Sequence, residues 1–232
     1  MFVTGEEWGL VTAGLLEKFR EVILGKKYLF HLHTNYTDGK CTVDDYCKWA
    51  VNRASEVLIF TEHIRKRPSY DFNRFLADID QARICYPDLE IWAGVEAKVL
   101  PGGGLDLSPE VAARVPVICF ACHSFPRDSK LYQKSLENLF SSPDWKDKIR
   151  VWVHPGRFLK KAGLLSVGVS FLQNLAAAAL TREVLIEVNL RENLLPEAFT
   201  KSIPAQLLIR GCDAHSLEDL DEYYTAPVQS QL

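Results

Sequence analysis

The sequence predicts an α/β fold in which seven parallel strands alternate with helices in one large domain. Seven short apolar runs, rich in β-branched and aromatic residues, have the length of buried strands, and segments of helical character separate most of them. Strands connected in this way pair in parallel through right-handed crossovers. The chain has 232 residues, which suits one such domain built either as an open doubly wound sheet or as a closed barrel.

The expected elements follow one another along the chain. The strands are expected at residues 28–34, 56–63, 91–98, 115–124, 151–155, 184–190 and 207–215. The helices between them are expected at residues 42–54, 70–85, 129–140, 167–180 and 196–201, and one more at 12–24 precedes the first strand. Residues 1–27 are therefore predicted to form an N-terminal helical extension to a domain over residues 28–232. Thr42 and Asp45 have the spacing of a capping box, which predicts that a helix begins there.

The bulk properties argue against several classes of protein. A net charge of −3 gives no basic face of the kind that extended nucleic-acid binding needs, although a local cluster could hold one phosphate or a short oligonucleotide. The glutamates of the first 24 residues argue against a secretory signal, and no apolar run approaches the roughly 20 residues of a membrane span. We therefore expect a cytoplasmic protein without a membrane partner.

The six cysteines include a single C-x-x-C pair, Cys119 and Cys122. Such a pair can bind zinc or carry redox chemistry. This one lies inside an apolar run and has no second pair to complete a zinc site. We interpret both thiols as packing residues of a strand.

The histidines give the clearest sign of function, because every one lies within or at the end of an expected strand. They are His31, His33, His63, His123, His154 and His215. Histidines with purely structural roles would also occur in helices and loops. In barrels the carboxyl ends of the strands meet at one mouth, where the active site lies. The placement therefore predicts a functional cluster.

Two-residue spacing brings pairs of these side chains together. His31 and His33 are two positions apart, as are Asp213 and His215, so strand alternation is expected to put each pair on one face. This arrangement offers two convergent ligands from each strand. A cluster of divalent metal ions is therefore predicted.

Two further carboxylates complete the predicted ligands. Glu96 ends the third expected strand, where it could bridge two cations, and Asp38 lies in the turn after the first. Imidazoles and carboxylates together favour zinc, manganese or iron over calcium. We expect two or three such ions.

Taken together, these motifs resemble those of the PHP family, named for its polymerase and histidinol phosphatase members. The matching motifs occur in the family's order: His31-Leu32-His33 with Asp38-Gly39, Thr61-Glu62-His63, Gly94-Val95-Glu96, Ala121-Cys122-His123, Val153-His154-Pro155-Gly156-Arg157 and Gly211-Cys212-Asp213-Ala214-His215. The family more often has Thr-Asp-His where this chain has Glu62. Since Glu62 should point away from His63 along the strand, we expect it behind the ligands or at the surface.

The resemblance implies a distorted, TIM-barrel-like (β/α)7 barrel with a trinuclear metal site at its C-terminal mouth. It assigns the ligands to three ions: His31, His33, Glu96 and Asp213 to the first, Glu96, His123 and His154 to the second, and Asp38, His63 and His215 to the third. It also implies a metal-dependent phosphoesterase. Cations held in this way would activate a hydroxide for attack on phosphorus.

Several other polar residues are assigned by their position after the ligands. Arg157 and Lys98 are predicted to clamp phosphate oxygens, with a solvated charge at the rim as the alternative for each. The basic loop 64–67 either attracts anions to the mouth or is an ordinary solvated loop. Glu187 and Asn189 either line the site or form hydrogen bonds within the core.

The leading functional hypothesis is a hydrolase of a small phosphomonoester, such as histidinol phosphate or a nucleotide. The alternatives are a phosphodiesterase or 3′-5′ exonuclease that acts on short oligonucleotides, and a non-catalytic metal-binding barrel with a regulatory role. Hydrolysis of C–N bonds is a further alternative, but no lysine stands at a ligand position as a carbamylated lysine would.

Overall fold

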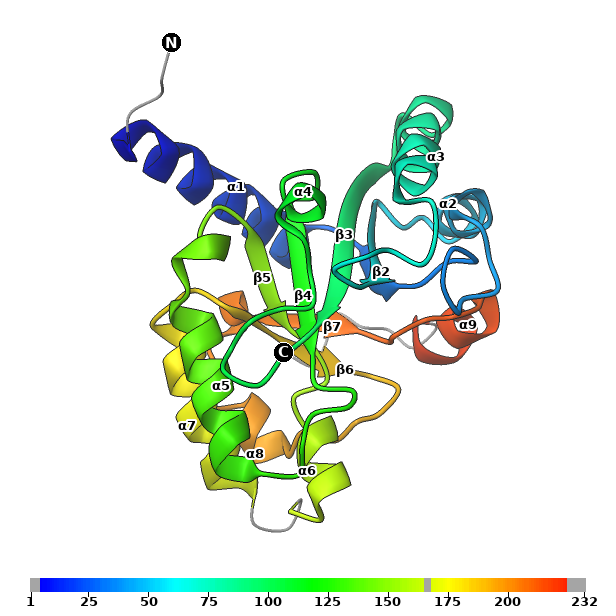
Figure 1. Ribbon diagram of the computed structural model, residues 1–232. Helices are drawn as coiled ribbons and strands as arrows, with labels where there is room; N and C mark the ends of the chain where they lie inside the picture. The colour runs from blue at the N-terminus through cyan, green and yellow to red at the C-terminus, as the bar shows by residue number, and fades with distance from the viewer. Residues whose placement is uncertain (1–4, 165–167, 225–232) are drawn as a thin grey trace.

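The computed structural model, which describes residues 5–164 and 168–224, contains one sheet of seven strands (Figure 1). The strands lie in sequence order, and all neighbours pair in parallel. Their bounds are β1 Tyr28–Leu32, β2 Val57–Ile64, β3 Glu90–Lys98, β4 Val117–Ala121, β5 Ile149–Trp152, β6 Leu185–Asn189 and β7 Leu208–Gly211. All seven predicted strands are present, so the α/β class is confirmed.

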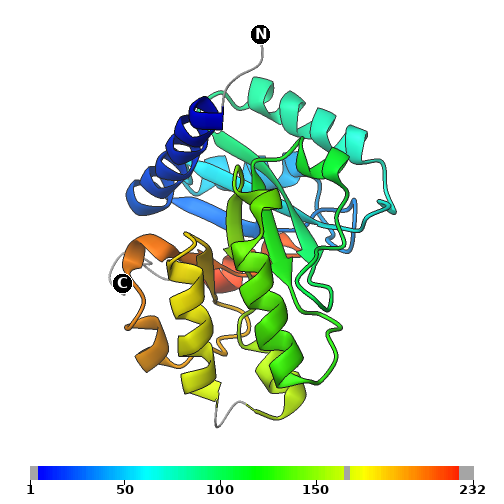
Figure 2. The same cartoon turned by 60° about the vertical axis from the view of Figure 1, so that its left-hand side comes forward.

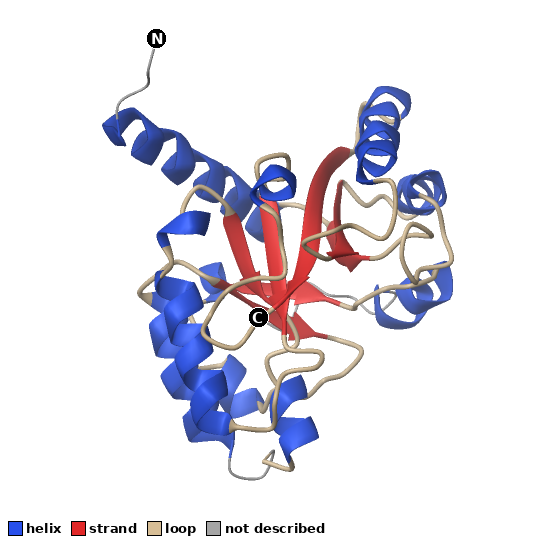
Figure 3. Ribbon diagram, in the orientation of Figure 1, coloured by secondary structure: helices blue, strands red, loops and turns tan. Residues whose placement is uncertain are grey.

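Helices surround the sheet, whose strands occupy the centre of the molecule (Figure 3). The α-helices are α1 Gly5–Gly25, α2 Val43–Asn52, α3 Phe72–Cys85, α4 Pro109–Ala112, α5 Ser129–Ser141, α6 Arg157–Ala162, α7 Gly168–Leu180, α8 Glu197–Thr200 and α9 Leu217–Tyr224, with 3-10 turns η1 Pro143–Trp145 and η3 Ala205–Leu207. Helices α5 and α7 lie side by side (Figure 2). The sequence analysis missed the short helices α4, α6 and α9, and residue 167 of one expected helix lies outside the described residues.

Local sequence signals explain where the longer helices begin. Thr42 forms the predicted capping box of α2, since its hydroxyl accepts a hydrogen bond from Asp45 N and the Asp45 carboxylate accepts one from Thr42 N. Asp71 caps α3 and Asp128 caps α5 with one hydrogen bond each, in which the carboxylate accepts from a backbone N–H of the first helical turn. These caps fix the ends of the helices that follow β1, β2 and β4.

The sheet curls until β1 and β7 meet, so the closed-barrel alternative is the right one. We call this junction the β1–β7 seam. Its backbone pairing is short: Ala214 N donates to His31 O at 2.9 Å, and His33 N donates to Ala214 O at 2.9 Å. Both bonds lie at the carboxyl ends of the strands. The barrel is thus closed by main-chain hydrogen bonds at the mouth that carries the histidines.

Two tyrosine hydroxyls bridge the rest of the β1–β7 seam. The Tyr28 hydroxyl accepts a hydrogen bond from Arg210 N at 2.9 Å, and the Tyr224 hydroxyl accepts one from Phe30 N at 3.3 Å. Side chains thereby satisfy backbone groups that a complete strand ladder would have paired. The barrel is nearly closed rather than fully hydrogen-bonded around its circumference.

Helix α1 packs on the barrel with the side chains of its C-terminal half. Phe19, Val22 and Ile23 are buried in the core, and the Phe19 ring meets the edge of Trp92 at 5.2 Å. The boundary proposed at residue 27, between an extension and a metallohydrolase domain, remains a prediction. No helix among the described residues has the length and apolar character needed to cross a membrane.

The C-x-x-C pair is part of the packed interior. Cys119 lies in β4 and Cys122 just after it, and both are buried free thiols. Burial raises the pKa of each thiol well above its ordinary value. Their burial in and beside β4 is what the predicted packing role requires.

Candidate metal centre

The structure gathers all nine predicted metal ligands at the carboxyl ends of the strands. They are His31, His33, Asp38, His63, Glu96, His123, His154, Asp213 and His215, and they form four overlapping groups whose ligand atoms lie within 4.8 Å of one another. The groups are His33, Asp38, His63 and His215; His31, Glu96 and His154; His31, His33 and Asp213; and His63, Glu96 and His123. The assignment of particular ligands to three separate ions remains a prediction.

Glu96 lies at the middle of the cluster. The parallel register of β2 and β3 sets it beside His63, and its Oε2 lies 2.8 Å from His63 Nδ1. Its Oε1 lies 3.3 Å from His123 Nε2 and 3.4 Å from His154 Nε2. Burial alone would raise the pKa of Glu96, but the nearby imidazoles, His154 and His31 foremost, hold it well below its ordinary range. Glu96 is therefore an anion that faces ligands on both of its oxygens.

The buried polar atoms of the cluster test whether cations fit. Both carboxylate oxygens of Glu96, Nε2 of His31, His33 and His154 and Oδ1 of Asp213 are buried without a well-oriented hydrogen bond, and they meet other side chains of the cluster only as ion pairs. Buried polar atoms without partners are rare because each one costs free energy. These atoms lie on facing side chains, and all belong to residue types that bind zinc or manganese. The donor set therefore fits divalent cations.

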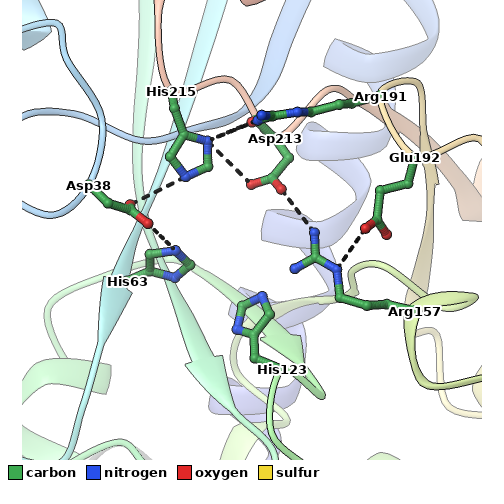
Figure 4. A pocket seen from close by; sticks show the side chains of 8 residues that line it. All are labelled: Asp38, His63, His123, Arg157, Arg191, Glu192, Asp213 and His215. Atoms are coloured by element: carbon green, nitrogen blue, oxygen red, sulfur yellow. Dashed lines mark hydrogen bonds and ion pairs between the residues drawn. The ribbon is translucent and has the colours of Figure 1, made fainter. Parts of the chain in front are cut away.

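A more open part of the cluster surrounds Asp38, whose side chain is 58% exposed. Its carboxylate oxygens lie 3.5 Å from His63 Nε2 and 3.3 Å from His215 Nε2 (Figure 4). Partial burial acts to raise the pKa of Asp38, but the charges of His63 and His215 outweigh it and lower that pKa. Asp38 is thus ionised and accessible from solvent.

The backbone brings the ligands together in a way that the strand alternation did not predict. His31, His154 and Asp213 have positive φ angles of 71°, 50° and 54°, a left-handed conformation that costs about 1–3 kcal/mol for a non-glycine residue. The pairing of β1 with β2 also shifts at His31, and Asp213 lies beyond the end of β7. The alternation of side chains along a regular strand, on which the prediction relied, therefore does not explain why these side chains converge.

Glu187 and Asn189 of β6 lie behind the ligands. Glu187 Oε1 lies 2.5 Å from His31 Nδ1, and Oε2 accepts a hydrogen bond from His154 N at 2.9 Å. Asn189 Nδ2 lies 3.2 Å from His154 Nδ1. Partners of this kind fix the orientation of a ligating imidazole and leave its Nε2 for a cation. Both residues therefore contact predicted ligands from the interior.

Glu62 is also fully interior, so the surface alternative for this residue was wrong. Its side chain has no exposed area, and its carboxylate accepts hydrogen bonds from Thr34 N and the Thr37 hydroxyl. Burial raises the pKa of Glu62 to about 7 in spite of these bonds. The residue points toward the β1–α2 loop rather than into the metal cluster.

Four of the clustered imidazoles have shifted pKa values, two of them lowered and two raised. Burial lowers the pKa of His33 and of His123 to about 4, so both are neutral at pH 7. Burial acts in the same direction on His31 and His63, but nearby carboxylates outweigh it and raise their pKa values. The raised pKa favours the imidazolium form of His31 in the metal-free protein. A cation that binds there must displace its proton.

The mouth of the barrel opens into two adjoining cavities. The first, of about 600 Å³, is lined by Arg157, Arg191, Glu192, Asp213 and His215 together with Asp38, His63 and His123, and we call it the arginine lobe (Figure 4). The second, of about 590 Å³, is lined by Tyr36, Thr37, Ile64, Arg65, Ser69, Glu96 and Lys98 together with the same three residues, and we call it the lysine lobe. Three ligands therefore line both lobes.

The two residues predicted to clamp phosphate lie in different lobes. In the arginine lobe Arg157 is already paired, since Nε lies 3.0 Å from Glu192 Oε1 and Nη2 lies 3.2 Å from Asp213 Oδ2. Lys98 lines the other lobe. Of the basic loop 64–67, Arg65 reaches the lysine lobe and pairs with Asp106 at 3.3 Å.

Sequence reasoning missed Arg191 and Glu192. Both lie within three residues of the end of β6, near the position where the other strands carry their predicted ligands. Arg191 Nη1 donates to Asp213 O at 3.1 Å and lies 3.4 Å from His215 Nδ1. Their position after the sixth expected strand could have indicated them. Neither residue belongs to the metal-ligand motifs on which the prediction was based.

Comparisons with known proteins agree with this architecture. The PHP domain model matches residues 30–151, which is more than half of the chain. The fold is similar to that of histidinol phosphate phosphatase from Lactococcus lactis subsp. lactis Il1403, solved with zinc, L-histidinol and phosphate. The TM-score is 0.56 at 15% identity, over 86% of this chain and 92% of the phosphatase. A search of curated proteins gave no match.

Proposed function

Since the chain belongs to the PHP-domain family, we propose that it is a metal-dependent phosphoesterase that hydrolyses a small phosphomonoester. The observation that carries this proposal is the set of buried imidazole and carboxylate atoms that converge around Glu96 without well-oriented hydrogen bonds. The similar fold of a phosphatase solved with zinc and phosphate supports the same class of reaction.

The nine clustered residues are proposed to hold two or three zinc, manganese or iron ions. Such ions, when bound, supply Lewis acidity, which lowers the pKa of water and offsets the negative charge of a phosphoryl group. Glu96 would contribute an oxygen to each of two neighbouring groups. Glu187 and Asn189 would keep the imidazoles of His31 and His154 in orientation.

The arginine lobe is proposed to bind the phosphoryl group. Arg157 and Arg191 offer guanidinium donors on one side of the lobe, and such donors match phosphate oxygens in pairs. Glu192 holds the Nε edge of Arg157, which leaves the other edge directed toward Asp213 and the cavity. These side chains would orient the phosphorus for in-line attack by water and stabilise charge in the transition state.

The lysine lobe is proposed to receive the leaving group. Tyr36, Ile64 and Ser69 provide a mixed apolar and hydroxyl lining, and Lys98 supplies a cation beside them. Each lobe has about the volume of a small-molecule site. A small organic phosphate therefore fits the dimensions of the mouth.

Phosphate release from a panel of phosphomonoesters, measured with manganese- or zinc-loaded protein, tests the proposal. Cleavage of short oligonucleotides is assayed in parallel. We expect release from one or more monoesters and its loss with a chelator. Cleavage of oligonucleotides alone would replace the proposal with a nuclease. Inactivity toward both, with bound metal confirmed, would refute phosphoester hydrolysis.

A further inference from the structure

Glu62 and the loop that carries Asp38 form one hydrogen-bonded unit. We propose that Glu62 is a positioning residue that fixes Asp38 for cation binding by anchoring residues 34–37 of this loop. The inference rests on the proposed metal centre. It concerns how one of the ligands is held in place rather than which residues are ligands.

The contacts of Glu62 are directed entirely at the loop. Oε1 accepts a hydrogen bond from Thr34 N at 2.5 Å, and Oε2 accepts one from the Thr37 hydroxyl at 2.6 Å. The Glu62 side chain is completely buried. Charged groups at such positions are costly unless they are hydrogen-bonded, so this carboxylate makes a specific connection. It connects β2 to Thr34 and Thr37, which lie at the two ends of the turn before Asp38.

The loop itself is tightly folded on Thr34. Thr37 N and Gly39 N both donate to Thr34 O, at 3.1 and 3.0 Å. A Cβ on Gly39 would lie 2.2 Å from His33 O, so only glycine permits the close approach of the backbone after Asp38. Displacement of Thr34 or Thr37 would consequently move Asp38, which lies between Thr37 and Gly39.

Asp38 depends on this loop for its position. Its side chain is 58% exposed, and its ion pairs are with His63 and His215, which belong to the same candidate metal group. Those contacts change when a cation takes the lone pairs of the three side chains. The loop, held by Glu62, therefore determines where Asp38 lies in both the metal-free and metal-bound protein.

The length and the acceptor atoms of Glu62 allow a sharp choice of variants. Glu62→Asp withdraws the carboxylate by one C–C bond, about 1.5 Å, and breaks both contacts. Glu62→Gln keeps an oxygen for Thr34 N, and its amide can donate to the Thr37 hydroxyl because a hydroxyl both donates and accepts. The two variants separate the geometric role of Glu62 from its charge.

Metal content and affinity, measured by elemental analysis and zinc titration of the purified full chain, test the proposal. We expect Glu62→Asp to weaken one zinc equivalent about 10–100-fold, as loss of a supporting contact usually does. Glu62→Gln should retain near-normal affinity. Thr37→Val, which removes only the hydroxyl contact, should give a smaller loss and serves as a milder variant if Glu62→Asp folds poorly. Leu58→Ala, in the buried start of β2, controls for destabilisation and should keep full metal content.

The double variant with Asp38→Ala gives the decisive comparison. If Glu62 acts through Asp38, Glu62→Asp should weaken binding no further once Asp38 is removed, whereas independent effects would add. Additive losses, or unchanged zinc affinity in both Glu62→Asp and Thr37→Val, would overturn the proposal. Equal losses in Glu62→Asp and Glu62→Gln would also overturn it, since geometry alone would not explain them. Failure of the wild-type chain to bind zinc would instead refute the metal centre and, with it, this inference.

Discussion

Replacement of Glu187 by glutamine is expected to weaken metal binding from behind the site. Each oxygen of Glu187 has its own contact, at 2.5 Å with His31 Nδ1 and at 2.9 Å with His154 N. Glutamine offers one acceptor and one amide donor, so the variant either leaves one of these two nitrogens unpaired or pairs its amide with an unprotonated His31 Nδ1, which moves the ring proton to the Nε2 that faces the cluster. A Cβ on Gly211 would lie 2.4 Å from Glu187 Oε1, so the backbone of β7 packs closely against this oxygen.

The expected magnitude follows from those contacts. One buried unpaired donor costs about 1–3 kcal/mol of unfolding free energy in the metal-free protein. Loss of a group that orients a ligating imidazole lowers metal affinity about 10–100-fold. Competition titration with a chelator measures the affinity, and denaturant unfolding measures the stability. Glu183→Gln, at the exposed start of the same β6 region, is the matched control and should change neither quantity by much. Unchanged affinity in Glu187→Gln would refute the supporting role.

Three further predictions concern the ligands and the arginine lobe. Glu96→Gln should abolish phosphatase activity and lower metal content, because one of its two central oxygens becomes a donor; full activity would exclude a bridging role. Arg157→Ala should raise the KM for phosphomonoesters more than it lowers thermal stability, and unchanged kinetics would remove Arg157 from the site. Metal binding should release protons, because the pKa values of His31 and His63 are raised in the metal-free protein. The ion pairs of these two imidazolium groups with carboxylates stabilise the metal-free fold fully below pH 6.5, and this stabilisation is lost as pH rises through the raised pKa values. Metal affinity should therefore fall as pH falls. Calorimetry in buffers of different ionisation enthalpy measures the released protons, and a buffer-independent heat would contradict this account.

The strands were predictable because their physical signal is local. Buried parallel strands are short continuous apolar runs, and all seven such runs became strands. The choice between an open sheet and a barrel was not decided by these runs, because closure depends on contacts between β1 and β7, far apart in sequence. The helices α4, α6 and α9 have at most eight residues each, too few for a clear helical period.

Which residues gather in the candidate site was predictable from residue type and from position at or after a strand, but the geometry of these residues was not. The left-handed backbone at His31, His154 and Asp213 is imposed by the tertiary structure and has no sequence signal in residues of these types. Glu62 illustrates a second limit, since strand alternation placed it correctly away from His63 but did not reveal that a loop covers it. The pairing of Arg157 with Glu192 likewise joins the first residue of α6 to the loop after β6, with α7 and β6 between them in the sequence.

Bound cations would also help to hold the barrel closed at the β1–β7 seam. The candidate ligand group of His31, His33 and Asp213 straddles it, because the two histidines come from the first strand of the sheet and the aspartate follows the last. A cation held by these three side chains would be a non-covalent cross-link between the two edges of the sheet, at the end where Ala214 forms main-chain hydrogen bonds with His31 and His33. During synthesis this cross-link cannot form until Asp213 has left the ribosome. Amide hydrogen exchange at the seam should therefore slow on metal loading more than it does between β2 and β3, whose ladder is complete without any ion.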